Sequence, residues 1–336
     1  MNDSLLGTPV RSRAAVDATE AYSGAWIEKV ELVDGTSLVL KHLPATGDWL
    51  TRATGGLGRT RALWDRGLFG HLEPAVEHGI LDVAATIGHD VVVMRDLSDR
   101  LWPAATPLHR RDVSDALAGL ARLHQLGERL IAEGHVGNLR LCPEGARYRM
   151  FAPGVLSDDD GPNPHPARDR ILAGWEAFAE TVDADILDAV DAVHRDPDSL
   201  GRRLAAACRC PTILHGDAKP ENLGVTNGRL TAIDWGELTG VGAREVDVAW
   251  FAVMSTRSRL DVDPDEVFTL YEQAGGSPLD PVMLDLTYLG SLAQMGFYLA
   301  AVARDARQPA TRHTAATRLA WWVDRVRVSL ERAGPP

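Results

Sequence analysis

Three side chains that can do chemistry lie close together in one stretch of the sequence. Residues 213–223 read ILHGDAKPENL, and a short pair of predicted strands then leads to AIDW at 232–235. Asp217 supplies a carboxylate, Asn222 an amide oxygen five residues later, and Asp234 a second carboxylate twelve residues beyond. Phosphoryl transfer from a nucleotide needs one carboxylate to orient the attacking hydroxyl and accept its proton, and hard oxygen ligands for the bridging Mg²⁺. The set therefore predicts phosphoryl-transfer chemistry.

The first part of the chain predicts a small α+β lobe. Residues 25–43 contain two β-rich runs separated by Asp34-Gly35, the strongest short signal for a hairpin. Residues 60–72 carry leucines and a tryptophan at helical spacing, and residues 76–83 and 89–94 have the composition of short strands. We expect an N-terminal nucleotide-binding lobe over residues 1–95, built from an antiparallel sheet and one helix.

The rest of the chain predicts a mainly helical lobe over residues 96–336. Residues 111–126 place valine and leucine side chains on one helical face, and residues 171–193, 264–273, 281–304 and 311–332 show the same periodicity. We expect this lobe to hold the catalytic loop and the acceptor site. The polar, Pro-rich residues 158–166 predict a surface loop rather than a domain boundary.

Composition restricts the partners and the location. The chain has 336 residues, and 35 lysines and arginines against 47 aspartates and glutamates give a net charge of −12. This charge opposes binding to nucleic acid or to an anionic membrane surface. We expect residues 286–303, which are uncharged but interrupted by polar side chains and glycines, to form a buried helix rather than a membrane span. Three cysteines in no disulfide or metal pattern, and no secretory signal at the start, predict a cytoplasmic protein.

Over nearly its whole length the chain resembles the aminoglycoside phosphotransferase and choline kinase branch of the protein-kinase-like fold. The motif His215-Gly-Asp217 with Asn222, followed by Ile233-Asp234-Trp235, carries this resemblance. Lys41, in the run LVLK, resembles the strand lysine that contacts the nucleotide's phosphates. The resemblance implies a bilobal α+β fold and an ATP-dependent phosphotransferase that acts on an alcohol.

Further residues match the same pattern. The run LAGLARLH, ending at His124, resembles the first helix of the large lobe, and Asp247 resembles the downstream aspartate that braces the catalytic loop. The hinge between the lobes corresponds to Met94, Arg95, Asp96 and Leu97. We place the turn that covers the nucleotide at residues 22–25, with Ser23 and Gly24 approaching the phosphates.

The resemblance assigns roles to individual residues. Asp217 corresponds to the general base, and Asn222 and Asp234 correspond to the Mg²⁺ ligands. Lys41 corresponds to the contact with the α- and β-phosphates of ATP or GTP. His215 and Lys219 belong to the catalytic motif, and Lys219 resembles the lysine that approaches the γ-phosphate in Ser/Thr protein kinases.

One feature departs from the family pattern. The family places a glutamate on the small-lobe helix to pair with the strand lysine, but this region of the sequence offers Arg59, Thr60 and Arg61. The nearest acids are Asp48, Asp65 and Glu73. The sequence therefore does not identify the carboxylate that pairs with Lys41.

The acceptor is a small-molecule alcohol whose identity the sequence leaves open. Candidate acceptor-lining residues are Glu237, Arg244, Asp285 and Gln294. Carboxylates such as Glu237 and Asp285 suit a cationic aminoglycoside, aminosugar or amino alcohol, whereas Trp235, Tyr288 and Gln294 suit a neutral sugar, nucleoside or macrolide.

Two other functions compete with a metabolite or antibiotic kinase. A Ser/Thr protein kinase fits Lys219, but Asp234 is followed by Trp-Gly rather than Phe-Gly, and residues 236–246 are short for a regulated activation loop. A nucleotide-binding pseudokinase without turnover is the other alternative. The sequence allows either a monomer or a homodimer.

Overall fold

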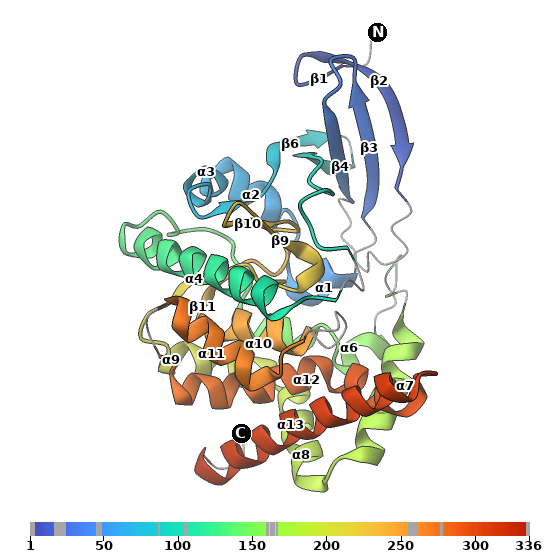
Figure 1. The fold of residues 1–336 in the computed structure, drawn as a ribbon, viewed down its shortest axis with the longest axis vertical. Helices are drawn as coiled ribbons and strands as arrows, with labels where there is room; N and C mark the ends of the chain where they lie inside the picture. The colour runs from blue at the N-terminus through green and yellow to red at the C-terminus, as the bar shows by residue number, and fades with distance from the viewer. Residues whose placement is uncertain are drawn as a thin grey trace.

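The chain forms two lobes, with an antiparallel sheet at one end and a group of helices at the other (Figure 1). The predicted nucleotide-covering turn, with Ser23 and Gly24, lies outside the residues that the computed structural model describes. These are residues 4–16, 25–44, 49–86, 88–103, 107–158, 161, 165, 167–254, 261–275 and 278–333.

The N-terminal lobe is built on a six-stranded antiparallel sheet of order β1-β2-β3-β4-β7-β6. The predicted hairpin is confirmed, because the tight turn at Asp34 and Gly35 joins β3 to β4 and the φ of Gly35 is +87°. Two strands not predicted from the sequence, β1 and β2, extend the sheet at one edge. The strands are β1 (Ser4–Leu5), β2 (Thr8–Ala15), β3 (Trp26–Leu32), β4 (Ser37–Pro44), β6 (Ile80–Thr86) and β7 (His89–Arg95).

Three short helices follow β4 where the sequence predicts one. They are α1 (Trp49–Thr54), α2 (Arg59–Asp65) and α3 (Leu68–Leu72). The predicted helix over 60–72 is divided because Gly67 adopts a left-handed φ of +70°, which ends α2 and starts α3 in a new direction. The buried side chains of Leu63, Leu68 and Phe69 still pack into one core.

A second sheet joins the two lobes. The predicted strand at 76–83 is split at Gly79, whose φ is +71°, into β5 (Val76–Glu77) and β6. β5 pairs in parallel with β10 (Arg229–Ala232), which pairs in antiparallel fashion with β9 (Leu223–Thr226). A strand from the first lobe is thus hydrogen-bonded directly to the hairpin that connects Asn222 to Asp234.

The C-terminal lobe is mainly helical, as expected. The predicted helix over 171–193 is two helices, separated at Val182 and Asp183, and the helices over 197–207 and 245–254 were not anticipated. Its helices are α4 (Arg110–Ala132), α5 (Glu144–Arg149), α6 (Pro153–Asp158), α7 (Arg168–Thr181), α8 (Ala184–Arg195), α9 (Pro197–Ala207), α10 (Glu245–Met254), α11 (Pro264–Gly275), α12 (Pro281–Asp305) and α13 (Pro309–Ala333). A short sheet of β8 (Thr212–Leu214) and β11 (Gly240–Gly242) and the 3₁₀ turn η1 (Pro220–Asn222) complete the lobe.

The apolar helix α12 is a core element. Among the described residues it alone is long and apolar enough to cross a membrane, but 78% of its most apolar window is buried inside the protein. It packs against α7, α10 and α13 (Figure 1). The expectation of a buried helix at 286–303 is confirmed.

β9 lies close to the segment around Arg100 and Leu101 that follows β7, and this makes Gly224 sensitive to substitution. A Cβ atom at Gly224 would overlap the backbone carbonyl oxygen of Arg100, and the Trp102 amide donates to the Leu223 carbonyl at 3.1 Å. We expect Gly224→Ala to lower the free energy of unfolding by about 1–3 kcal/mol through overpacking. Urea denaturation measures this change. Gly154→Ala is the matched control, because its Cβ meets no atom within 4 Å, and equal denaturation midpoints for the two variants would contradict the prediction.

Candidate active site

The predicted catalytic motif lies on a loop whose path is tightly constrained at Gly216. The loop leaves β8 at Leu214 and ends in η1, so that Asp217 and Asn222 stand at its two ends. Gly216 has a φ of +87°, and a Cβ there would overlap the carbonyl oxygen of Leu238. Only glycine satisfies both conditions, and it turns the chain so that the next residue, Asp217, lines a cavity between the lobes.

The carboxylate of Asp247, on α10, holds the backbone of this loop. Its Oδ2 accepts from the His215 amide at 2.7 Å and its Oδ1 accepts from the Gly216 amide at 2.9 Å. The side chain is fully buried, which by itself raises the pKa of the carboxyl, but hydrogen bonding and charge from His124 outweigh burial and lower that pKa. His124 Nε2 lies 3.3 Å from Oδ2, and the Tyr271 hydroxyl lies 2.6 Å from His124 Nδ1.

His215 connects the catalytic loop to the loop that carries Asp234. Its Nε2 lies 2.9 Å from the Ile233 carbonyl oxygen, and its Nδ1 accepts from the Asp217 amide at 3.2 Å. Burial lowers the pKa of the imidazole, so it is neutral and carries its proton on Nε2. With both ring nitrogens bonded to backbone groups, His215 fixes the positions of its neighbours.

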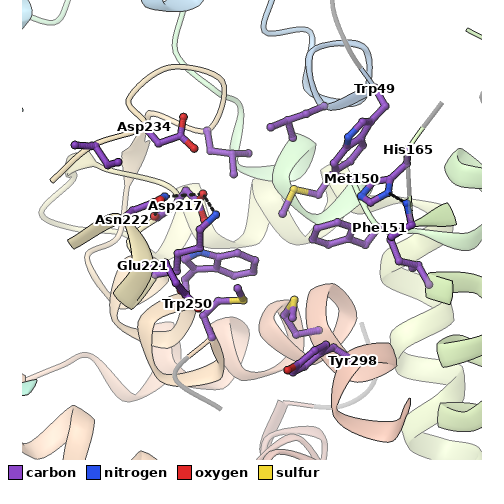
Figure 2. A pocket seen from close by; sticks show the side chains of 18 of the residues that line it. Trp49, Met150, Phe151, His165, Asp217, Glu221, Asn222, Asp234, Trp250 and Tyr298 are labelled. Carbon is purple, nitrogen blue, oxygen red and sulfur yellow. Dashed lines mark hydrogen bonds and ion pairs between the residues drawn. The ribbon is translucent and has the colours of Figure 1, made fainter. Parts of the chain in front are cut away.

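Three donors hold the carboxylate of Asp217 in one orientation. Lys219 Nζ donates to Oδ2 at 2.7 Å and Asn222 Nδ2 donates to the same atom at 2.9 Å. The indole Nε1 of Trp250 donates to Oδ1 at 2.9 Å. Burial lowers the pKa of Lys219, but the charges of Asp217 and Asp234 outweigh burial and raise it, so the ammonium group stays charged. Figure 2 shows Asp217 and Asn222 on one side of the pocket with Asp234 above them.

Asp234 supplies the partner that Lys41 lacked in the sequence. Lys41 Nζ, on β4, donates to Asp234 Oδ1 at 2.5 Å. The charge of Lys41 is the largest influence on Asp234 and holds its pKa well below the usual range, so the carboxylate is ionised. Asp234 has a φ of +67°, a left-handed conformation that aims its side chain into the cavity.

Arg59 lies near the position of the expected helix glutamate, but it binds backbone carbonyl groups instead of Lys41. Its buried guanidinium on α2 donates to the backbone carbonyls of Arg140, Thr54 and Glu237. The neighbouring Thr60 hydroxyl donates to the Trp235 carbonyl at 3.3 Å. The helix therefore binds the backbone just after Asp234 rather than the side chain of Lys41.

These groups meet in one cavity of about 800 Å³. Lys41, Asp217, Lys219, Asn222 and Asp234 all line it, so the structure brings together the residues that the sequence placed far apart. The two oxygen donors, Asn222 and Asp234, share this wall. Among the described residues no group of three or more His, Cys, Asp or Glu side chains could hold a metal by itself. Two protein oxygens fit Mg²⁺, which is usually held by one or two carboxylates together with substrate phosphates.

Of the hinge residues, Met94 lines the cavity and the other three make structural contacts. Asp96 pairs with Lys29 at 2.5 Å, and Arg95 lies 3.5 Å from Glu77. The Asp96 amide donates to the Ser37 carbonyl at 3.2 Å, which continues the β4–β7 pairing into the hinge. Leu97 is buried beside Gly79.

The four candidate acceptor residues are not among the described residues that line the cavity. Gln294 donates to the Arg147 carbonyl at 3.0 Å, and Asp285 accepts from Ser329 at 2.9 Å. Arg244 donates to the Pro278 carbonyl at 3.1 Å, and the Glu237 carbonyl accepts from Arg59. Helical periodicity does not show which face of α12 lines the cavity, so it could not place Asp285 and Gln294 relative to it.

Sequence reasoning missed the apolar residues that line the cavity beyond Asp217. Trp235, considered for a neutral acceptor, lines the cavity, whereas Tyr288 does not. The missed side chains are mainly aromatic residues and methionines that looked like ordinary core: Trp49, Met150, Phe151, Trp250, Met254, Met295, Phe297 and Tyr298. One signal was available, because Trp250 follows Asp247 by three residues and therefore lies one helical turn away.

The contacts of Asp247 predict a large effect of a small substitution. Each carboxylate oxygen of Asp247 accepts a hydrogen bond from a backbone amide. In Asp247→Asn the NH₂ group must replace one of these oxygens, so two buried N–H donors face each other without an acceptor. We expect a loss of about 2–3 kcal/mol in the free energy of unfolding, measured by urea denaturation. Asp324→Asn makes the same chemical change at an exposed site on α13 and should cost less than about 1 kcal/mol. A loss no larger than that of the control would contradict the role given to Asp247.

Arg59 offers a second test within one helix. A lysine cannot reach three separate carbonyl groups, so we expect Arg59→Lys to lower stability by about 1–3 kcal/mol although the charge is kept. Arg61→Lys, two residues away, alters a partly exposed pair with Asp65 and should change stability by less than about 1 kcal/mol. Thermal unfolding compares the two, and equal melting temperatures would contradict the prediction.

Comparison with known proteins gives a family match and solved structures with the same fold. The model of the phosphotransferase enzyme family matches residues 19–284. No curated protein is significantly similar in sequence. Among solved structures, spectinomycin phosphotransferase APH(9)-Ia, in complex with ADP and spectinomycin, is 10% identical with a TM-score of 0.55, and the match covers 96% of this chain and 94% of that one. Choline kinase LicA from Streptococcus pneumoniae is 12% identical with a TM-score of 0.54, and 94% of each chain is covered.

At such identities the structural likeness shows the fold, which is the bilobal fold of protein-kinase-like enzymes. The family match covers most of the chain and includes every residue that meets at the polar wall of the cavity. The chain therefore belongs to the phosphotransferase enzyme family.

Proposed function

We propose that the protein transfers the γ-phosphoryl group of ATP or GTP to a hydroxyl group of a small molecule. One observation supports this proposal most strongly: a single cavity is lined by Asp217, Asn222, Asp234, Lys41 and Lys219. The spectinomycin phosphotransferase that shares the fold was solved with ADP, which supports a nucleotide as the phosphoryl donor.

Asp217 is proposed as the general base. The hydroxyl oxygen of the acceptor forms a bond to the γ-phosphorus while the bond from that phosphorus to the β–γ bridging oxygen breaks. The hydroxyl proton passes to Asp217, and the nucleoside diphosphate leaves with the bridging oxygen. Trp250, Lys219 and Asn222 hold the carboxylate so that it does not need to reorient when the acceptor arrives.

Asn222 and Asp234 are proposed to hold Mg²⁺, which would neutralise the charge that develops on the phosphates. The amide nitrogen of Asn222 already donates to Asp217, which leaves its side-chain oxygen for the metal. Asp234 is ionised, as a metal ligand must be. Lys41 lies beside it and would contact the α- and β-phosphates, while Lys219 lies next to Asp217 and would contact the γ-phosphate.

The nucleotide base is proposed to lie between the lobes. Apolar side chains from β3, β4, β6 and β7 line that part of the cavity: Ile27, Val39, Ile80, Val92 and Met94. Apolar walls of this kind suit a purine ring without distinguishing adenine from guanine.

The two alternative functions receive less support. Residues 237–244 connect the Asp-Trp-Gly segment to α10 and include β11, which leaves little room for a peptide platform. A pseudokinase would be favoured if Lys41 had no carboxylate nearby, but Lys41 is paired with Asp234.

The proposed base predicts the effect of one substitution. Asp217→Asn should lower kcat by about 10²–10⁴ because the amide cannot accept the proton, while the nucleotide should bind nearly as well. Mg²⁺-dependent nucleotide consumption with added alcohols measures kcat, and calorimetry measures nucleotide affinity. Asp99→Asn, at an exposed position outside the cavity, should behave like the wild type. Undiminished consumption in Asp217→Asn would contradict the proposal.

A further inference from the structure

The part of the cavity beyond Asp217 has a different character from the polar wall. Side chains from α1, α7, α10 and α12 and from residues 150–151 surround it. Figure 2 shows Trp49, Met150 and Phe151 across the pocket from Asp217, with Trp250 beneath Asp217 and Tyr298 lower in the view. We call this region the acceptor chamber and define it by Trp49, Met150, Phe151, Trp250, Met295 and Tyr298.

The walls of the acceptor chamber are preformed by ring packing. The ring centroids of Trp49 and Phe151 lie 5.6 Å apart, and those of Trp49 and His165 lie 4.0 Å apart. Phe151 in turn lies 5.5 Å from Phe297. Contacts of this kind hold rings in fixed orientations, while the thioethers of Met150 and Met295 adapt to the outline of an apolar ligand. The chamber therefore offers a large apolar surface before any ligand arrives.

The charges around the cavity do not favour a polycation. The described lining carboxylates are Asp217, Glu221, Asp234 and Asp305, and the described lining cations are Lys41, Lys219 and Arg170. Three of the carboxylates are already paired with protein cations: Asp217 with Lys219 at 2.7 Å, Asp234 with Lys41 at 2.5 Å, and Asp305 with Arg304 at 2.9 Å. Each ammonium group of a polycationic aminosugar would lose its hydration in this chamber with few carboxylates to replace the water.

Trp250 connects the chamber to the proposed chemistry. Its indole nitrogen donates to Asp217 Oδ1 at 2.9 Å, and its ring forms part of the chamber wall. Met254 lies one turn further along α10 on the same wall. An apolar body resting on Trp250 would therefore place a hydroxyl group at its edge beside the carboxylate of Asp217.

We propose that the acceptor is an uncharged, lipophilic alcohol whose hydroxyl is carried on a bulky aromatic or polycyclic body, because the acceptor chamber is built from packed rings and thioethers around Asp217. This inference rests on the proposed function, since it names the substrate class of the same site.

Binding and turnover should be measured separately on the full chain. Isothermal titration calorimetry with Mg²⁺ and ADP present compares chloramphenicol and oestradiol, which are neutral lipophilic alcohols, with kanamycin, choline and fructose. We expect at least one lipophilic probe to bind at least tenfold more tightly than the other three compounds. No binding of either lipophilic probe, or tighter binding of kanamycin or choline, would overturn the proposal.

Turnover of the same compounds tests the proposed function by itself. A lipophilic probe that binds in the chamber without Asp217-dependent consumption of ATP or GTP supports the proposed substrate class and counts against the kinase reaction. Phosphorylation of kanamycin or choline with a lower KM than any lipophilic probe supports the reaction and overturns the substrate class.

One variant locates the binding in the chamber. Tyr298→Lys places an ammonium group in the chamber wall at a half-buried position, and we expect it to raise the Kd of the lipophilic probe at least tenfold. Val282→Lys adds the same charge at an exposed site on the same helix and should leave this Kd unchanged. Phe151→Asn, on a separate wall, gives a second measure should Tyr298→Lys fold poorly. Unchanged Kd values in both chamber variants would overturn the proposal.

Discussion

The buried carboxylate of Asp247 is the contact on which the rest of the site depends. A charged group shielded from solvent is stable only when it is paired and hydrogen-bonded, and here two backbone amides and a histidine supply these contacts. The carboxylate and the loop stabilise each other. The catalytic loop satisfies the carboxylate, and the carboxylate fixes the loop, so α10, α4 and α11 are joined to it through Asp247, His124 and Tyr271. His215, on the same loop, bonds to the Ile233 carbonyl and so fixes the backbone just before Asp234.

The two lobes are coupled by contacts between backbone groups and by hydrogen bonds from α2. Arg59 and Thr60 on α2 bind carbonyl groups that follow Asp234, and β5 pairs with β10. The segment after β7 packs on Gly224 without room for a side chain. These contacts set the distance between Lys41 in one lobe and Asp234 in the other, which explains how the lysine finds a carboxylate without a helix glutamate. The coupling also positions α1, which supplies Trp49 to the far side of the cavity.

The sequence predicted the parts of this molecule that depend on local chemistry. Asp34-Gly35 identified the hairpin because a tight turn needs those residue types. Asp217, Asn222 and Asp234 could be predicted to meet because all three lie on loops at the ends of short strands. Long helices such as α12 followed from periodicity. The break between α2 and α3 at Gly67 and the break between β5 and β6 at Gly79 were not predicted, because the sequence does not show whether a glycine has a positive φ. The partner of Lys41 and the apolar chamber were missed because both arise from packing between elements far apart in the sequence, and a methionine or tryptophan facing a cavity looks the same in sequence as one in a core.

We propose that one cavity holds the nucleotide's phosphates against Asp217, with a metal held by Asn222 and Asp234. The most direct measurement is a crystal structure with Mn²⁺ in place of Mg²⁺ and a non-hydrolysable ATP analogue, in which anomalous scattering locates the metal. We predict a metal peak about 2.1 Å from Asn222 Oδ1 and from a carboxylate oxygen of Asp234, with Lys41 Nζ in contact with a phosphate oxygen. A nucleotide bound with its metal away from these two residues, or phosphates turned away from Asp217, would contradict the account.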